Sequence, residues 1–253
     1  MPLFIQLHGR GIDPVRFDLW TGMAAYASER GWAVALPAAI GEIWNDGRWA
    51  GTEIAEIDDV GFLDTLIEDT ARRLPIDRDR VYVAGMSNGA TMAARCVCER
   101  STRVAAVAQV AGTAAEAVVA GCHPTRPVPI LEIHGAADRF APYDGGVAAG
   151  AIARMFIRRR ADPSVGVDAW AEHWVRTNRA DPKPRQERIG TSTSVRRWSG
   201  QTQRSDVVFI RTEGAGHTWP GARTWIVPIL GRVTRDFDAT ETIWRFFEAH
   251  PGA

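Results

Sequence analysis

Ser87 lies in the segment Gly-Met-Ser-Asn-Gly, which has the G-x-S-x-G pattern of a nucleophilic serine. The apolar run at 81–86 is typical of a buried strand, and the alanine-rich stretch at 88–100 is typical of a helix. In such a strand–turn–helix unit the glycines stand where a Cβ atom would collide with neighbouring backbone, and the serine hydroxyl is exposed at the edge of the sheet. The pattern predicts a nucleophile; the alternative is a glycine-flanked serine in an ordinary turn.

A serine hydroxyl is a weak nucleophile near neutral pH, so it needs a histidine as base, and the histidine needs an acid that fixes its tautomer. Asp138 follows an expected strand at 128–133, and His217 follows an expected strand at 207–211 in a glycine-rich segment. Active sites of open α/β sheets gather at such strand ends. The sequence therefore predicts a triad of the serine, Asp138 and His217, with Asp144 as the leading alternative for the acid.

Acyl transfer also requires backbone N–H groups that stabilise a tetrahedral oxyanion. The residue after the nucleophile, Asn88, commonly supplies one donor, and the loop after an early strand supplies the other. That loop holds Arg10 between Gly9 and Gly11. We expect the N–H groups of Asn88 and Arg10 to form the oxyanion hole, although the two glycines could serve the turn alone.

The remaining histidines lack this combination of chain order and loop placement. His8 and His134 each end an expected strand directly before a glycine, so we expect them to brace loops. The chain has no motif with the ligand spacing of a metal site and no glycine-rich phosphate-binding motif. We therefore expect no metal, no cofactor and no nucleotide.

Composition limits the possible partners. The chain has 253 residues, of which 45% are apolar, and this predicts a single domain spanning 1–253. Thirty Lys and Arg balance thirty Asp and Glu, so no net field would attract nucleic acid or an anionic membrane. The three cysteines Cys96, Cys98 and Cys122 are an odd number and are expected to be buried thiols of a reducing compartment. With no leader segment visible, the protein is expected to be cytoplasmic as given, or secreted if a signal peptide precedes this chain.

Strands and helices alternate along the chain, which predicts a mainly parallel sheet with helices on both faces. The expected strands lie at 3–7, 32–36, 81–86, 104–110, 128–133 and 207–211. The expected helices lie at 17–30, 58–74, 88–100, 146–159, 167–179 and 239–250. The segment 37–57 is expected to be irregular, and the polar segment 180–205 is expected to be a loop.

Several longer motifs together resemble one family. In chain order they are LHGRG, WNDGRW, IDDVGF, IDRDRVYVAGMSNG, PILEIHGAAD, APYDGG, EGAGHTWPGA and DFDATETIWRFF. This succession resembles the polyhydroxybutyrate depolymerase and feruloyl esterase group of α/β-hydrolases. The resemblance implies an α/β-hydrolase fold and a serine carboxylesterase that acts on a small-molecule or oligomeric ester without a cofactor.

The resemblance also implies that Trp219 and the loop residues Trp44 and Trp49 line the substrate pocket; packing in the core is the alternative for each. A non-catalytic member of the fold that binds a ligand or a partner is the alternative function. Cleavage of a peptide or thioester by the same residues is a further possibility.

The sequence departs from that family at its start. Relatives usually have a β-hairpin before the strand that ends in LHG, and the residues before position 3 leave no room for one. The strand at 32–36 would then form an uncovered apolar edge, which is a hazard for pairing with other chains. We expect either that a second copy covers this edge in a homodimer or that the natural chain begins upstream.

Overall fold

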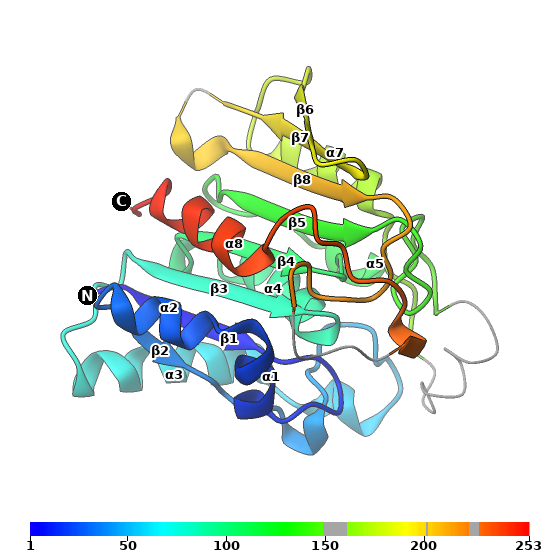
Figure 1. Cartoon of the computed structure of the whole chain (residues 1–253). Coiled ribbons are helices and arrows are strands. Elements are labelled where there is room, and N and C mark those ends of the chain that lie inside the picture. The colour runs from blue at the N-terminus through cyan, green and yellow to red at the C-terminus, as the bar shows by residue number, and fades with distance from the viewer. Residues whose placement is uncertain (149–160, 201, 223–227, 253) are drawn as a thin grey trace.

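A central sheet organises the computed structural model, which describes residues 1–148, 161–200, 202–222 and 228–252. Within these residues the sheet has eight strands in the order β2-β1-β3-β4-β5-β8-β7-β6 (Figure 1). Neighbouring strands from β2 to β8 are parallel, and β7 and β6 continue the sheet in antiparallel fashion. The strands are β1 Leu3–Leu7, β2 Ala33–Ala35, β3 Val81–Met86, β4 Ala106–Val110, β5 Ile130–Gly135, β6 Arg185–Ile189, β7 Thr193–Trp198 and β8 Val207–Thr212. The expected helix at 146–159 lies, from residue 149 onward, outside the described residues.

Helices cover both faces of the sheet, as the alternation of elements predicts. One face carries α1 Pro14–Thr21, α2 Met23–Glu29 and α8 Ala239–Glu248, and the other carries α3 Asp59–Arg73, α4 Asn88–Glu99, α5 Glu116–Ala120 and α7 Val167–Thr177 (Figure 1). Short 3₁₀ turns are η1 Ile40–Glu42, η2 Glu53–Glu56, η3 Ser101–Arg103, η4 Gln203–Ser205 and η5 Pro228–Leu230. Each face has its own apolar core, because alternate residues of every strand point to opposite sides.

Local chemistry explains where two of these helices begin and end. The side chain of Asp58 accepts a hydrogen bond from the Gly61 N–H at 2.9 Å and caps α3. The expected helix at 17–30 is instead two helices. Gly22 has a φ of 67°, a left-handed conformation that ends α1 and begins α2.

The polar segment at 180–205, expected to be a loop, contains β6 and β7. Thr193, Val195 and Trp198 of β7 are buried, and the two arginines between Val195 and Trp198 are not. Six backbone positions of β7 pair with β8, so a polar strand is held by the apolar strand beside it. The prediction of a loop was wrong because the segment is mostly polar and the buried apolar residues of β7, Val195 and Trp198, belong to the cores on opposite faces of the sheet, so no simple alternation marks the strand.

The strand expected at 32–36 forms an outer edge of the sheet within the described residues. It is shorter than expected, since β2 has three residues and pairs in parallel with β1 from Leu3 to Ile5. Such a short edge strand offers few backbone groups to another chain.

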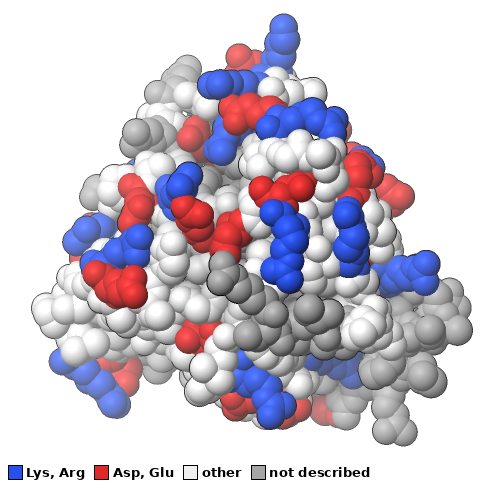
Figure 2. Space-filling view, viewed as in Figure 1, with Lys and Arg blue, Asp and Glu red and all other residues white. Residues whose placement is uncertain are grey.

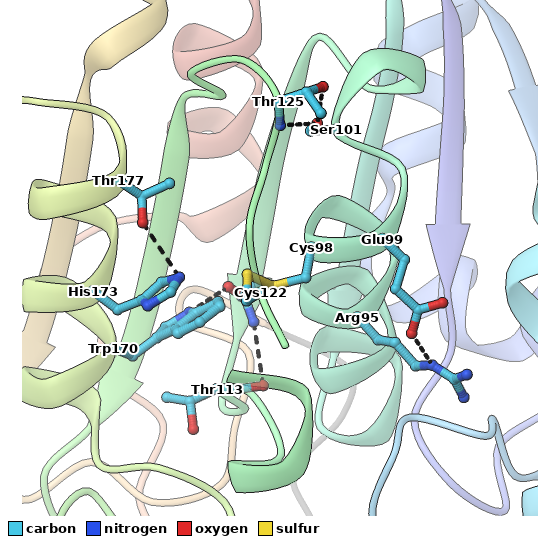
Figure 3. Close-up of a disulfide and its surroundings, with 11 residues drawn as sticks. Arg95, Cys98, Glu99, Ser101, Thr113, Cys122, Thr125, Trp170, His173 and Thr177 are labelled. Carbon is cyan, nitrogen blue, oxygen red and sulfur yellow. Dashed lines mark hydrogen bonds and ion pairs between the residues drawn. A yellow bond between two sulfur atoms is a disulfide. The ribbon is translucent and has the colours of Figure 1, made fainter. Parts of the chain in front are cut away.

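Two of the three cysteines are paired, which corrects the expectation of three buried thiols. Cys98 near the end of α4 forms a disulfide with Cys122, which follows α5, and their Cα atoms are 4.7 Å apart (Figure 3). Cys96 is a buried free thiol. Spacing within α4 excludes a bond between Cys96 and Cys98, but the approach of α5 to α4 is a tertiary feature. Disulfides persist in oxidising compartments, so this pair removes the support that the cysteines gave to a reducing one.

Charges of both signs are interspersed on the surface. Figure 2 shows Lys and Arg side chains next to Asp and Glu side chains across the face that carries α1, α2 and α8. One such pair joins α2 to α8, where Arg30 Nε lies 3.0 Å from Glu248 Oε1. Among the described helices, none combines the length and apolar character that crossing a membrane requires.

Candidate active site

Ser87 stands at the sharp turn between β3 and α4. Its φ of 57° and ψ of −122° are unusual for a residue with a side chain, and such strain is typical of functional turns. The two glycines of the motif permit this turn. A Cβ atom on Gly85 would lie 2.4 Å from the backbone of Gly89, and one on Gly89 would lie 2.2 Å from the Leu7 carbonyl oxygen. The local sequence therefore folds into the expected strand–turn–helix unit.

His217 and Asp138 meet across two strand ends. The Nδ1–H of His217 donates to Asp138 Oδ2 at 2.7 Å, and both side chains are buried. The loop after β5 and the loop after β8 can approach because Gly135 has no side chain; a Cβ atom there would lie 2.4 Å from the Ala215 carbonyl oxygen. The Ala137 N–H also donates to that oxygen at 2.9 Å. Asp144, the alternative acid, is exposed.

The environment of Asp138 favours its ionised form. Burial by itself raises the pKa of this carboxyl, but the charge and hydrogen bond of His217, followed by the charge of His134, bring the pKa below its ordinary value. Its other oxygen, Oδ1, accepts from the N–H groups of Phe140 at 2.8 Å and Ala141 at 2.9 Å. An ionised and fully bonded carboxylate is well suited to hold one tautomer of His217.

A cavity of about 520 Å³ opens in front of this pair, within the size range of small-molecule sites. Five residues expected at the site line it, namely Arg10, Trp49, Ser87, Asn88 and His217. Apolar side chains from two loops and from α1, β3 and η5 complete much of the wall, namely Ile12, Phe140, Trp20, Met86 and Leu230. Asp138 does not line the cavity and is joined to it through its hydrogen bond with His217.

The two expected oxyanion donors come from two segments that meet at Ser87. Asn88 is the first residue of α4, and the first N–H groups of a helix have no partner within it. Arg10 follows Gly9, and a Cβ atom added to Gly9 would lie 3.6 Å from the Cβ of Ser87. The loop that carries Arg10 therefore lies directly against the nucleophile.

His8 fixes the start of that loop, as expected. Its Nε2 accepts the N–H of Ala39 at 3.0 Å, and its Nδ1 lies 2.9 Å from the Gly9 carbonyl oxygen. An imidazole that accepts at Nε2 and donates at Nδ1 is neutral. Burial lowers the pKa of His8, which favours the same neutral form.

Trp44 does not line the cavity, and this corrects the expectation that it contacts substrate. The side chain is fully buried, and its indole N–H donates to the His8 carbonyl oxygen at 3.0 Å. The backbone of Trp44 is bonded to the side chain of Asn88 twice, from its N–H at 2.8 Å and to its carbonyl oxygen at 3.0 Å. Trp44 therefore connects the two segments that carry the expected oxyanion donors.

The same loop contributes an ion pair that the sequence reasoning missed. Asp46 is fully buried and accepts from Asn88 Nδ2 at 2.6 Å and from Arg48 Nε at 3.0 Å. Arg48 lines the cavity and reaches Ser164 Oγ at 3.4 Å. The only signal in the sequence was the WNDGRW motif, whose charged residues have no period that assigns them to a site.

Trp49 and Trp219, the other two tryptophans expected to line the pocket, lie in different parts of the structure. Trp49 lines the cavity, donates its indole N–H to the Trp44 carbonyl oxygen at 3.0 Å, and lies under the guanidinium of Arg10 at 5.5 Å. Trp219 is buried in the core that α8 covers, where it donates to Thr240 Oγ1 at 3.1 Å. The expectation that Trp219 contacts substrate is wrong for this structure, because its ring packs on Phe17 instead.

Comparison with known proteins gives relatives of one kind. The chain is 30% identical over 249 residues to a protein of Nocardia uniformis subsp. tsuyamanensis named "Putative esterase NocK", and the match covers 95% of this chain and 72% of that protein. It is 28% identical over 200 residues to feruloyl esterase B of Piromyces equi, covering 77% of this chain and 35% of that enzyme. The chain thus spans about a third of the second relative. No model of a protein family matches the chain.

Solved structures show the same fold at low identity. The acetyl xylan esterase from Aspergillus awamori superposes with a TM-score of 0.62 and 13% identity, over 98% of this chain and 89% of that one. Its likeness supports the fold and says nothing about the residues of the site.

Proposed function

Because this chain belongs to the feruloyl esterase group of α/β-hydrolase esterases, we propose that it hydrolyses carboxylic esters through an acyl-enzyme formed on Ser87. One observation carries the proposal: Ser87, on its strained turn, lines the same cavity as His217, whose Nδ1–H is bonded to the buried Asp138. A nucleophile, a base and an acid that orients the base are the groups that acyl transfer needs.

In the first half of the reaction, Ser87 Oγ attacks the ester carbonyl carbon while His217 Nε2 takes the hydroxyl proton. The N–H groups of Asn88 and Arg10 donate to the resulting oxyanion, and Asp138 stabilises the imidazolium. The ester C–O bond then breaks, and His217 returns the proton to the departing alkoxide. Water attacks the acyl-enzyme by the same route and releases the acid, so the cycle needs no cofactor.

The cavity walls suit an ester with an apolar or aromatic acyl group. Trp49 offers an indole face, and Ile12, Trp20 and Leu230 are half-buried apolar side chains around the same space. Two substrate classes are proposed. One is aromatic esters, such as ferulates, and the other is short hydroxybutyrate oligomers. Hydrolysis rates for methyl ferulate, hydroxybutyrate oligomers and p-nitrophenyl esters, measured side by side, distinguish them.

Replacing Ser87 with alanine tests the mechanism. We expect Ser87→Ala to lose hydrolysis of p-nitrophenyl acetate and labelling by a fluorophosphonate while its unfolding transition stays close to that of the wild type. Ser28→Ala is the matched control, because Ser28 is exposed in α2 and does not line the cavity. Turnover by Ser87→Ala at the wild-type rate would refute the assignment. A wild-type chain that is not labelled and not active would favour the non-catalytic alternative.

A further inference from the structure

Two ionisable side chains lie behind Asp138 and take no part in the reaction described above. Glu132 and His134 are alternate residues of β5, so they point to the same side of the sheet, and both side chains are fully buried. His134 Nδ1 lies 2.8 Å from Glu132 Oε1. Neither residue lines the cavity, so they cannot contact substrate there.

His134 is joined to the loop that carries Asp138. Its Nε2 lies 2.8 Å from the Ala141 carbonyl oxygen and 3.7 Å from Asp138 Oδ2. Because a carbonyl oxygen can only accept, Nε2 must carry a proton. The N–H of the same Ala141 donates to Asp138 Oδ1 at 2.9 Å, so His134 and Asp138 bond the carbonyl oxygen and the N–H of one residue.

One proton is shared between the other nitrogen of His134 and Glu132. It lies either on Glu132, leaving His134 neutral, or on Nδ1, giving an imidazolium next to a carboxylate. The pair has no net charge in either form, but only the second form puts a positive charge 3.7 Å from the Asp138 carboxylate. The location of this proton therefore matters for the triad.

The surroundings decide between these forms. On β8 the register neighbour of His134 is Arg211, whose guanidinium lies 4.6 Å from the ring of Tyr143, and that ring in turn packs edge-on against His134. Arg211 Nε lies 2.8 Å from Glu213 Oε1, and the Tyr143 hydroxyl donates to Asp168, which pairs with Arg196, so each of these charges has an opposite charge beside it. On β4 the register neighbour of Glu132 is the uncharged Gln109.

Asp138 is thus the nearest charge outside the pair, and its carboxylate favours the imidazolium. Burial lowers the pKa of His134, but the hydrogen bond and charge of Glu132, followed by the charge of Asp138, raise it above the ordinary value. Burial raises the pKa of Glu132 to about 7. The Asp138 carboxylate, 3.7 Å from His134 Nε2, is the neighbouring charge that favours the form with the proton on His134.

We propose that Glu132 and His134 are positioning residues of this active site: Glu132 keeps His134 protonated on both nitrogens, and the imidazolium holds the Asp138 loop and offsets part of the Asp138 charge. The proposal rests on the proposed function of Asp138 and His217. The Asp138 carboxylate stabilises the imidazolium that forms on His217 during the reaction, and a positive charge behind Asp138 weakens that stabilisation. The pair therefore tunes how strongly Asp138 acts on the base.

The variant Glu132→Gln tests this role. Glutamine has nearly the same shape and can donate to Nδ1, so His134 becomes neutral while its bond to Ala141 remains. The acid limb of the pH profile of kcat/KM for p-nitrophenyl acetate should then move to higher pH by on the order of half a pH unit. This shift is smaller than the shift that a charge in direct contact with His217 would cause, because Asp138 lies between the two histidines. Glu248→Gln, which removes an exposed carboxylate of α8, should leave the limb in place. A uniform loss of activity at all pH values with no movement of the limb would show a purely structural role and overturn the proposal.

A second measurement does not depend on activity. The ¹⁵N chemical shifts of the His134 imidazole in the wild-type chain at pH 7 should be those of a doubly protonated ring, and a neutral ring would overturn the proposal even if Glu132→Gln does not fold. Failure of the proposed function would be seen separately, as turnover by Ser87→Ala.

Discussion

The side chain of Asn88 should contribute far more to the free energy of unfolding than an amide side chain on the surface. It makes three buried hydrogen bonds, two with the backbone of Trp44 and one with the Asp46 carboxylate. Hydrogen bonds between neutral groups contribute about 1 kcal/mol each and one to a charged group about 1.5 to 3 kcal/mol, so Asn88→Ala should lower the free energy of unfolding by about 3.5 to 5 kcal/mol. For a chain of this size the melting temperature should fall by roughly 10 °C.

The same change should slow catalysis without weakening binding. The bonds of Asn88 fix the start of α4, and with it the N–H group proposed to hold the oxyanion. Complete loss of one such donor costs about 100- to 1,000-fold in kcat, so a displaced donor should cost about 10- to 100-fold, with KM nearly unchanged. Urea unfolding followed by tryptophan fluorescence and steady-state kinetics on p-nitrophenyl acetate measure the two effects.

The chain contains a matched control for this experiment. Asn178 is also buried and also bonds both the N–H and the carbonyl oxygen of one residue, Val128, at 3.1 and 2.7 Å. Asn178→Ala should lower the free energy of unfolding by about 2 kcal/mol and leave kcat unchanged. The reasoning is refuted if Asn88→Ala costs less than about 1 kcal/mol, or if its kcat falls no further than that of Asn178→Ala.

Three further outcomes are expected. Titration of thiols in the denatured, unreduced chain should find only Cys96, and three free thiols would contradict the pairing of Cys98 with Cys122. Reduction of that disulfide, which joins residues 24 positions apart, should lower the free energy of unfolding by about 3 kcal/mol. Trp49→Ala should raise KM for aromatic esters while Trp219→Phe leaves it unchanged, and equal effects in kinetic assays would contradict the assignment of the cavity wall. Light scattering over a concentration series should detect a dimer if a second copy covers the edge at β2, and a monomer at all concentrations would exclude that alternative.

Features that depend on neighbouring residues in the chain could be predicted from the sequence. The turn at Ser87 follows from an apolar strand, two glycines and a helix former, all within about twenty positions. The fold class follows from the same kind of local alternation, repeated along the chain. Gly22 misled at this level, because a helical period continues across it while its backbone does not, and so did the polar segment at 180–205 that contains β6 and β7.

Features that depend on distant partners could not be predicted. Trp44 and Trp49 are five positions apart in one loop, yet only Trp49 reaches the cavity, because the indole of Trp44 is used to bond His8. The disulfide of Cys98 needs α5 to pack on α4. Glu132 and His134 gave only a weak signal, two polar residues at alternate positions of an otherwise apolar strand, and their link to the acid becomes visible only in the folded chain.

The hydrogen bonds of Trp44 limit the positions at which substrate specificity can change, whether by design or in evolution. Part of the cavity is lined by a loop whose buried polar groups form hydrogen bonds with one another and with the segments beside them. A substitution there leaves a buried donor or acceptor without its hydrogen bond. Ile12 and Leu230 also line the cavity, and their side chains fill space and form no such bonds. Exchanging these for other apolar residues alters the shape of the cavity at a small cost in stability. Substrate preference can therefore change at these two positions while the hydrogen bonds of the Trp44 loop stay intact.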